Sequence, residues 1–135
     1  MKSKLIAEAS KVIGPFQFDT YPTNYAGKVG AALITDRGNI YTGISVNLAC
    51  NVGSCAEHAA IVDMLKMRET KIAMIVSVYE GGKIIVPCGR CREMIIQIDS
   101  QNKNTLVIVD TEKTIPLSEL LPCPWYFEQN EDKHI

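Results

Sequence analysis

The sequence lacks any excess of positive charge. Its 135 residues include 14 Lys and Arg against 15 Asp and Glu, for a net charge of -1. Proteins that hold nucleic acids by neutralising phosphates normally present a basic face. We therefore expect no nucleic-acid partner, whereas a small-molecule substrate of any charge remains possible.

The chain also has no apolar run long enough to cross a bilayer, and Lys and Glu interrupt its first ten residues where a signal peptide would be apolar. Five cysteines are an odd number and too few for a disulfide scaffold. We expect a cytoplasmic protein without membrane contact, in which motif cysteines are metal ligands or catalytic groups. Low-complexity segments and internal repeats are absent, so residues 1–135 are expected to form a single domain.

Hydrophobic periodicity and turn residues predict a helix first, then a β-hairpin, then alternating helices and strands. The predicted helices span residues 2–13, 55–67 and 88–98, with Ser54 as the N-cap of the second and a last helical turn at 118–121. The predicted strands span residues 29–35, 40–46, 72–79, 84–86, 106–109 and 114–117.

This order is typical of an α/β protein with a mixed sheet. The turn at Asp36–Asn39 makes the first two strands an antiparallel hairpin. Right-handed crossovers place the two central helices on the same face of the sheet.

Cysteines at metal-ligand spacing occur at the predicted starts of both central helices. Cys88 and Cys91 form a C-x-x-C pair, and Cys55 lies about thirty residues upstream, two positions before Glu57. Three thiolates on zinc would leave one tetrahedral position open for water, beside a carboxylate that can move protons. The positive end of each helix favours thiolate. The pattern indicates a zinc hydrolase.

Each part of this pattern also has an ordinary structural interpretation. Ser54 and Glu57 fit a capping box, and free cysteines are often small buried hydrophobic residues. A lone C-x-x-C can be a redox pair. The two motifs together are much harder to explain in these ways.

The paired motifs Cys55-Ala56-Glu57 and Pro87-Cys88-Gly89-Arg90-Cys91-Arg92 resemble the zinc signature of the cytidine deaminase superfamily, in its three-cysteine free-nucleoside branch. Residues 29–33 and 119–122 resemble further family segments, so the similarity spans roughly residues 21–122. The resemblance implies a three-layer α-β-α sandwich with a mixed five-stranded sheet. It also implies Zn²⁺ as cofactor and hydrolytic deamination of a cytosine nucleoside.

Carried over to this chain, the resemblance makes Cys55, Cys88 and Cys91 the zinc ligands. Glu57 becomes the proton shuttle between the water on zinc, the pyrimidine ring nitrogen and the leaving amine. The main chain at Ala56 would hold the amino-pyrimidine edge. Zinc lowers the pKa of bound water from 15.7 to roughly 7.

Positively charged side chains near the motif are candidates for tuning the metal. Arg90 and Arg92 are second-shell candidates that would donate to sulfur and offset the charge of three thiolates. His58 stands where many family members have Arg. It could play that arginine's role beside the metal, but it could equally be a packed or solvent-facing histidine without such a role.

The family's ribose-binding N-x-E pair falls on Ser45 and Asn47, so the usual glutamate is missing. Anchoring the alignment at Cys55 instead gives Ile44 and Val46. The stretch Pro87–Arg92, with Arg90 in place of the usual small residue, resembles the corresponding motif of blasticidin S deaminase. That branch also lacks the ribose-binding glutamate. Cytidine or deoxycytidine therefore competes with a modified cytosine nucleoside such as blasticidin S.

Aromatic residues flank the matched core, and one of them is expected to stack on the base: Tyr21, Tyr25, Trp125, Tyr126 or Phe127. The resemblance also implies a homo-oligomer, expected to be a tetramer. Two other functions remain open. A structural zinc protein would need Cys50, His58 or Cys123 as fourth ligand, and a nucleic-acid-editing deaminase would need a basic surface.

Overall fold

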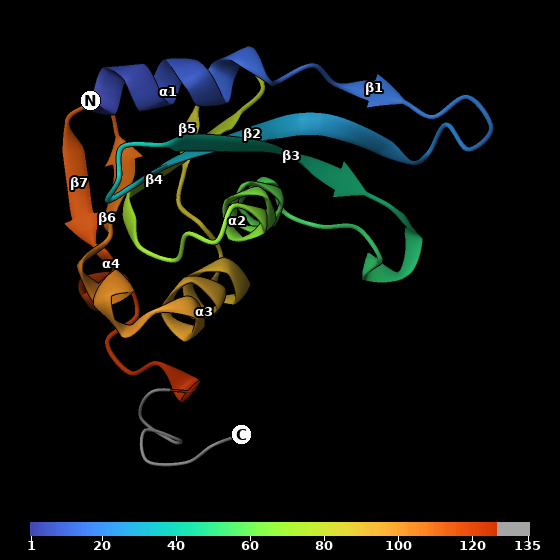
Figure 1. Cartoon of the computed structure of the whole chain (residues 1–135). Coiled ribbons are helices and arrows are strands. Elements are labelled where there is room, and N and C mark those ends of the chain that lie inside the picture. Colours follow the sequence, from blue (N-terminus) through green and yellow to red (C-terminus); the bar gives the residue numbers. More distant parts are fainter. Residues whose placement is uncertain (127–135) are drawn as a thin grey trace.

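The computed structural model describes residues 1–126, in which a sheet lies between the N-terminal helix and the later helices (Figure 1). The helices are α1 (Lys2–Lys11), α2 (Ala56–Lys66), α3 (Gly89–Ile98) and α4 (Leu117–Leu120), with 3-10 turns η1 (Ala49–Asn51) and η2 (Ser100–Asn104). The strands are β1 (Phe16–Gln17), β2 (Tyr25–Thr35), β3 (Ile40–Asn47), β4 (Ile72–Tyr79), β5 (Ile84–Ile85), β6 (Leu106–Asp110) and β7 (Lys113–Pro116).

The five longer strands form a mixed sheet in the order β3-β2-β4-β6-β7. Only β4 and β6 pair in parallel, and the other neighbours are antiparallel. The short strands β1 and β5 extend the edges of β2 and β4. The predicted five-stranded mixed sheet is confirmed, while β1, η1 and η2 were not predicted.

Two hydrophobic clusters define the layers on either side of the sheet. Leu5 and Ala9 of α1 pack on one face, against alternate residues of β2 and β4 such as Ala32 and Val76. On the other face α2 and α3 pack against the intervening residues, including Leu33 and Ile75. The chain is therefore a three-layer α-β-α sandwich, with both central helices on one face as the crossover rule predicts (Figure 1).

The β2–β3 hairpin turns at Asp36–Asn39, where Thr35 N–H donates to the Asn39 carbonyl and Gly38 has a φ of +87°. A left-handed residue at this point suits a tight connection that glycine makes at little steric cost. The predicted antiparallel hairpin is confirmed.

The N-terminus of α2 lies unusually close to β3. A Cβ atom on Gly43 would stand 2.5 Å from both the Ala56 carbonyl oxygen and the Ala60 nitrogen. The absent side chain therefore lets the first turn of α2, which carries Cys55, Ala56 and Glu57, lie directly on the sheet.

The predicted cap of α2 was wrong by one residue. The N-cap is Cys55, and no side chain caps the helix. The backbone N–H and carbonyl of Ser54 pair instead with Val46. This pairing, at 2.9 and 3.0 Å, keeps Ser54 extended beside β3. Glu57 is not part of a capping box, so its carboxylate is available for another role.

None of the helices in the part of the chain that the structure describes is both long and apolar enough to span a membrane.

Candidate metal centre and active site

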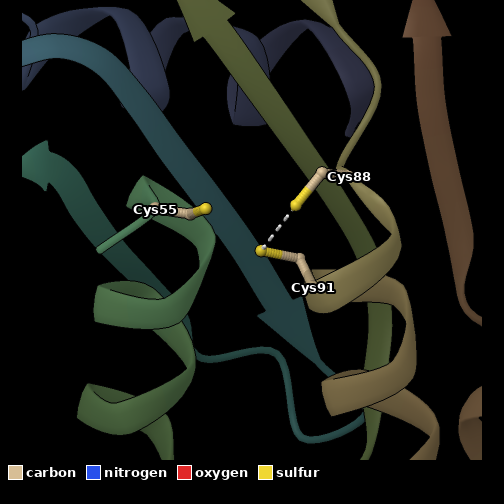
Figure 2. Close-up of side chains that lie close together, drawn as sticks. All are labelled: Cys55, Cys88 and Cys91. Atoms are coloured by element: carbon tan, nitrogen blue, oxygen red, sulfur yellow. Dashed lines mark hydrogen bonds between the residues drawn. The ribbon is translucent and has the colours of Figure 1, made fainter. Parts of the chain in front are cut away.

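The first turns of α2 and α3 meet above the sheet and bring three cysteines together. Cys55 and Cys88 are the N-cap residues of the two helices, and Cys91 lies in the first turn of α3. Figure 2 shows the three side chains directed toward one another from the two helix starts. Their sulfur atoms all lie within 4.8 Å of one another.

This spacing fits a zinc ion. Sulfur ligands at the corners of a tetrahedron, each about 2.3 Å from zinc, lie about 3.8 Å apart. The Cys88 and Cys91 sulfur atoms are 4.0 Å apart (Figure 2). Among residues 1–126, these three form the only group of His, Cys, Asp or Glu ligands close enough to share an ion.

The pKa values of the three thiols indicate that a bound cation would stabilise their thiolate forms. Burial raises the pKa of the Cys55 thiol. Burial and the nearby charges of Glu57 and the other two cysteines raise the pKa of Cys91. Burial opposes ionisation of Cys88 as well, but the backbone amides of Cys91 and Arg90 act on its sulfur and leave its pKa below the usual value. A divalent ion would relieve the repulsion among these groups and favour thiolates.

Glu57 lies beside the cysteines in the first turn of α2, and only 4% of it is exposed. It lines the same cavity as Cys55 and Cys88. A buried carboxylate at the open side of a metal site is suited to carrying a proton between water and substrate.

The cavity has a volume of about 420 Å³, within the range of small-molecule sites. Its walls come from the start of β2, the end of β3, the end of β4 and the two helix starts. Ser45, Asn47 and Ala56 all line it, and so does Val46, whereas Ile44 does not. The Ser45 hydroxyl accepts a 3.0 Å hydrogen bond from the Val29 N–H at the irregular part of β2.

The two candidate arginines are placed differently. Arg90 lines the cavity and is exposed. Arg92 instead donates through Nε to the Pro87 carbonyl at 2.8 Å and through a terminal nitrogen to the Leu120 carbonyl at 3.1 Å. The expected donation from Arg92 to sulfur is therefore corrected: its guanidinium binds two main-chain carbonyls and fixes the loop before Cys88.

Residues 8–109 match the cytidine and deoxycytidylate deaminase zinc-binding region. The chain belongs to the cytidine deaminase superfamily. It is an enzyme of the zinc-dependent deaminase type, and Zn²⁺ is its cofactor.

Curated cytidine deaminases and solved structures agree with this membership. The chain is 30% identical over 95 residues to a cytidine deaminase of Mycobacterium tuberculosis, covering 70% of this chain and 69% of that protein. It is 34% identical over 97 residues to one of Sporosarcina psychrophila, covering 70% and 67%.

Among solved structures, cytidine deaminase from M. tuberculosis superimposes with a TM-score of 0.74 and 25% identity, covering 91% of this chain and 95% of the other. The enzyme from Burkholderia pseudomallei gives 0.71 and 26%, covering 93% and 99%. These likenesses extend over the whole α-β-α sandwich.

The family of the chain and the geometry of the three cysteines both argue against a purely structural zinc site. Cys50, His58 and Cys123 were the candidates for a fourth ligand, and all lie in the described part of the chain. None of them belongs to the group of residues that could share an ion, which consists of Cys55, Cys88 and Cys91. Within residues 1–126, the three cysteines would hold a zinc ion without a fourth His, Cys, Asp or Glu in their group.

The aromatic residues that were candidates for stacking on the base differ in whether they line the cavity. Of the four that the structure describes, Tyr25 alone lines the cavity, while Tyr21 and Trp125 are largely exposed and Tyr126 lies outside the cavity wall. Phe127 lies outside the described residues.

Sequence reasoning missed Tyr79 and Lys28, which also line the cavity. Tyr79 ends β4, and the carboxyl end of a central strand next to helix starts is a place where ligands commonly bind. That rule could have pointed to Tyr79 from the sequence. Lys28 had no comparable indication.

Proposed function

We propose that this protein hydrolyses the amino group from the cytosine ring of a free nucleoside, giving the uracil nucleoside and ammonia. The observation that carries the proposal is the convergence of three cysteine sulfur atoms within 4.8 Å, two of them from residues that line a cavity with the buried Glu57. The cavity is large enough for a small molecule, and the named relatives are cytidine deaminases.

In this proposal Cys55, Cys88 and Cys91 hold the zinc ion, and no protein ligand fills the fourth position. When bound, zinc supplies a water molecule acidified for attack on the ring carbon that carries the amine. The backbone amides of Cys91 and Arg90 support the Cys88 thiolate, since they lower its pKa. Arg92 acts from outside the cluster by holding the Pro87 carbonyl in place.

Glu57 moves the protons. Its carboxylate accepts one proton from the attacking water and delivers it to the ring nitrogen, then passes the second proton of that water from the new C–OH group to the departing amine. Its position on the first turn of α2 places it next to Ala56, whose main chain is proposed to hold the amino-pyrimidine edge. Ala56 is 1% exposed and lines the cavity, so a larger side chain there would intrude on the site.

Ser45 and Asn47 are proposed to face the sugar. Both lie on β3 two positions apart, so they share one face of the strand. The Ser45 oxygen accepts from Val29, and its O–H is free to donate to a sugar oxygen. Tyr25 is the proposed stacking partner of the base, since it is the aromatic candidate on the cavity wall.

We further propose that the enzyme is a homotetramer and that it works in the cytoplasm. All five cysteines are free of disulfides, which suits a reducing compartment. The uncovered aromatic side chains of Phe16, Tyr21 and Trp125 would lie at the subunit contacts.

The test is an ultraviolet deamination assay of the zinc-loaded protein with cytidine, deoxycytidine, cytosine and blasticidin S side by side. Glu57→Gln should retain zinc and fold but lose a factor of about 10²–10⁴ in turnover. Glu112→Gln is the matched control, because Glu112 is an exposed carboxylate on the β6–β7 turn. Unchanged turnover in Glu57→Gln would remove Glu57 from the mechanism. Tight, salt-sensitive binding to tRNA or single-stranded DNA would favour a nucleic-acid substrate instead.

A further inference from the structure

Ser77 on the central strand β4 carries a fully buried hydroxyl group. The residue is 0% exposed. Within residues 1–126, its oxygen is one of two buried side-chain oxygen or nitrogen atoms without a hydrogen-bond partner. The other belongs to Glu69, whose second carboxylate oxygen accepts hydrogen bonds from Asn39 and Tyr41. Leaving a buried hydroxyl unpaired is unfavourable, so the Ser77 hydroxyl requires an acceptor.

The Ser77 side chain points to the face of the sheet that α2 and α3 cover. Side chains alternate between the two faces along a strand. Ile75 lies in the hydrophobic cluster beneath α2 and α3, whereas Val76 lies in the cluster beneath α1. Ser77 pairs with Ala31 of β2, which in turn pairs with Gly43 of β3. Partners in such a row point to one face, and on this face Gly43 meets the first turn of α2.

Cys91 faces the same layer from above. The strand β4 ends at Tyr79 and α3 begins after its N-cap Cys88, and both of these residues line the cavity. The helix therefore begins where the strand ends. Cys91 and Ile95 are four residues apart and both buried, so they share the face of α3 that packs on the sheet. Figure 2 shows β2 and β4 running behind the three cysteines.

The spacing along the strand matches the spacing along the helix. Ile75 of β4 and Ile95 of α3 belong to the same buried cluster. From Ile75 to Ser77 the strand advances toward the cavity by about 6.6 Å, at about 3.3 Å for each residue. From Ile95 back to Cys91 the helix covers about 6 Å in the same direction, at about 1.5 Å for each residue. Ser77 therefore lies opposite Cys91, between the helix and the sheet.

The Cys91 sulfur needs a new donor when the cluster binds a metal. It accepts a hydrogen bond from the Cys88 thiol at 4.0 Å. That bond is lost when the Cys88 thiol gives up its proton to become a ligand. The Cys88 sulfur itself is supported by the backbone amides of Cys91 and Arg90. A thiolate that has lost its donor thus lies opposite a hydroxyl that lacks an acceptor.

We propose that Ser77 is a positioning residue of the metal centre, whose hydroxyl donates a hydrogen bond to the Cys91 sulfur when that sulfur is a metal-bound thiolate. A serine hydroxyl changes direction through its staggered χ1 rotamers, so it can turn toward the sulfur. Such a bond orients the sulfur and takes up part of its charge, as the partners of metal ligands do. The inference rests on the proposed set of zinc ligands, and Ser77 takes no part in proton transfer.

The test compares metal binding by Ser77→Ala and by the wild type. Zinc affinity, measured by competition with a chelator, should fall by about 10- to 100-fold, as when the partner of a metal ligand is removed. In the cobalt-substituted proteins, the sulfur-to-cobalt charge-transfer band should move to longer wavelength in Ser77→Ala, because a thiolate without a donor releases electron density more readily. Ser10→Ala is the matched control, because Ser10 is an exposed serine on α1, on the opposite face of the sheet.

Urea unfolding distinguishes this role from a purely structural one. Zinc that binds only the folded chain stabilises it by an amount that depends on its affinity. The increase in urea midpoint on adding zinc should therefore be smaller for Ser77→Ala than for the wild type. A serine that only fills space in the core would shift the zinc-loaded and zinc-stripped chains equally, and that result would overturn the inference.

Wild-type zinc affinity and an unshifted cobalt band in Ser77→Ala would also overturn the inference, while leaving the three-cysteine site intact. Weaker zinc binding without a shift of the band would overturn it too, because Ser77 would then act on the fold and not on the sulfur. If the wild type deaminates no cytosine nucleoside but both metal effects appear, the proposed reaction fails and the hydrogen bond stands. A wild-type protein that binds neither metal would overturn the ligand set and this inference together.

Discussion

At the scale of single residues, the proposed chemistry depends on how three sulfur atoms share charge. Burial raises the pKa of each thiol in the cluster, but in Cys88 hydrogen bonds from two backbone amides and from the other two cysteines together leave the pKa below its usual value. Cys55 and Cys91 have raised pKa values, chiefly from burial. The cluster is therefore suited to forming its thiolates together with the ion, with proton release on zinc binding.

Replacing Cys91 with Ala should abolish tight zinc binding and deamination together. Cys91 is 1% exposed and is one of the three clustered cysteines, so its loss leaves only two sulfur ligands for the ion. Zinc content by atomic absorption and the deamination rate are the measurements. Cys123→Ala is the control, because Cys123 is exposed and lies outside the cluster. A Cys91→Ala protein that kept stoichiometric zinc would contradict the assignment of Cys91.

At the scale of elements, the site depends on the position of two helix starts relative to the sheet. Gly43 on β3 lets α2 approach so closely that a Cβ atom would stand 2.5 Å from the Ala56 carbonyl oxygen. Arg92 ties α3 to two other segments through the carbonyls of Pro87 and Leu120. Neither residue lines the cavity, and both determine where residues of the site lie.

Gly43→Ala should therefore reduce both stability and activity. The added methyl group meets main-chain atoms of α2, which cannot rotate away as a side chain could, and overpacking of this kind costs roughly 1–3 kcal/mol. We expect a lower urea midpoint and a deamination rate that falls by more than the fraction of unfolded protein explains. Gly89→Ala is the matched control, because nothing lies within 4 Å of the Cβ it would add. Equal effects of the two substitutions would contradict this account.

Arg92→Ala should loosen the loop that carries Cys88. It removes two charged hydrogen bonds to carbonyls, worth roughly 2 kcal/mol together with the packing of the side chain. We expect weaker zinc retention against a chelator and lower stability in urea. Arg92→Lys should recover little of either property, because one ammonium cannot reproduce the two directions of the guanidinium. If zinc dissociated from Arg92→Ala at the wild-type rate, Arg92 would not position the loop.

At the scale of the whole molecule, the end of the sheet opposite the cavity has its own buried polar cluster. Glu69, which is 4% exposed, accepts hydrogen bonds from the Asn39 side chain at 2.9 Å and from the Tyr41 hydroxyl. Hydrogen bonds from Thr35, Tyr41 and Asn39 lower the pKa of Glu69. The same bond from Tyr41, together with burial, raises the pKa of Tyr41 to about 12. These contacts fasten the β2–β3 turn to the segment after α2.

This cluster predicts a pH dependence of stability. Because the pKa of Glu69 is lower in the folded state, its charge stabilises the fold fully above the unfolded glutamate pKa of about 4.3, and this stabilisation is lost as pH falls through the folded value. Glu69→Gln should therefore lose stability at neutral pH and lose less than the wild type on acidification. Urea unfolding between pH 3 and 7 measures both. Glu112→Gln should keep the wild-type profile, and an identical profile for Glu69→Gln would contradict the prediction.

How much of the structure could be predicted from the sequence depends on how far apart in the chain the interacting residues are. Cys55, Glu57, Cys88 and Cys91 could be predicted as one site because each lies in a short motif at a helix start. The cap of α2 could not be predicted, because the backbone of Ser54 hydrogen-bonds to Val46, which lies eight residues away on β3. Nor could the partner of Arg92 at Leu120, or the place of Lys28 on the cavity wall, since both depend on packing and on the irregular register of β2.

The proposed tetramer is the prediction that concerns the molecule as a whole. The exposed aromatic residues Phe16, Tyr21 and Trp125 lie at the two ends of the described chain, outside the core clusters. Burying them between subunits would stabilise an assembly by about 25 cal/mol for each Å² of apolar surface removed from water. Light scattering should give about four times the chain mass of 14.9 kDa. Tyr21→Ser combined with Trp125→Ser should shift the mass toward smaller species, whereas Tyr126→Ser serves as a less exposed control. A monomeric wild-type protein with full deaminase activity would overturn the tetramer while leaving the proposed chemistry in place.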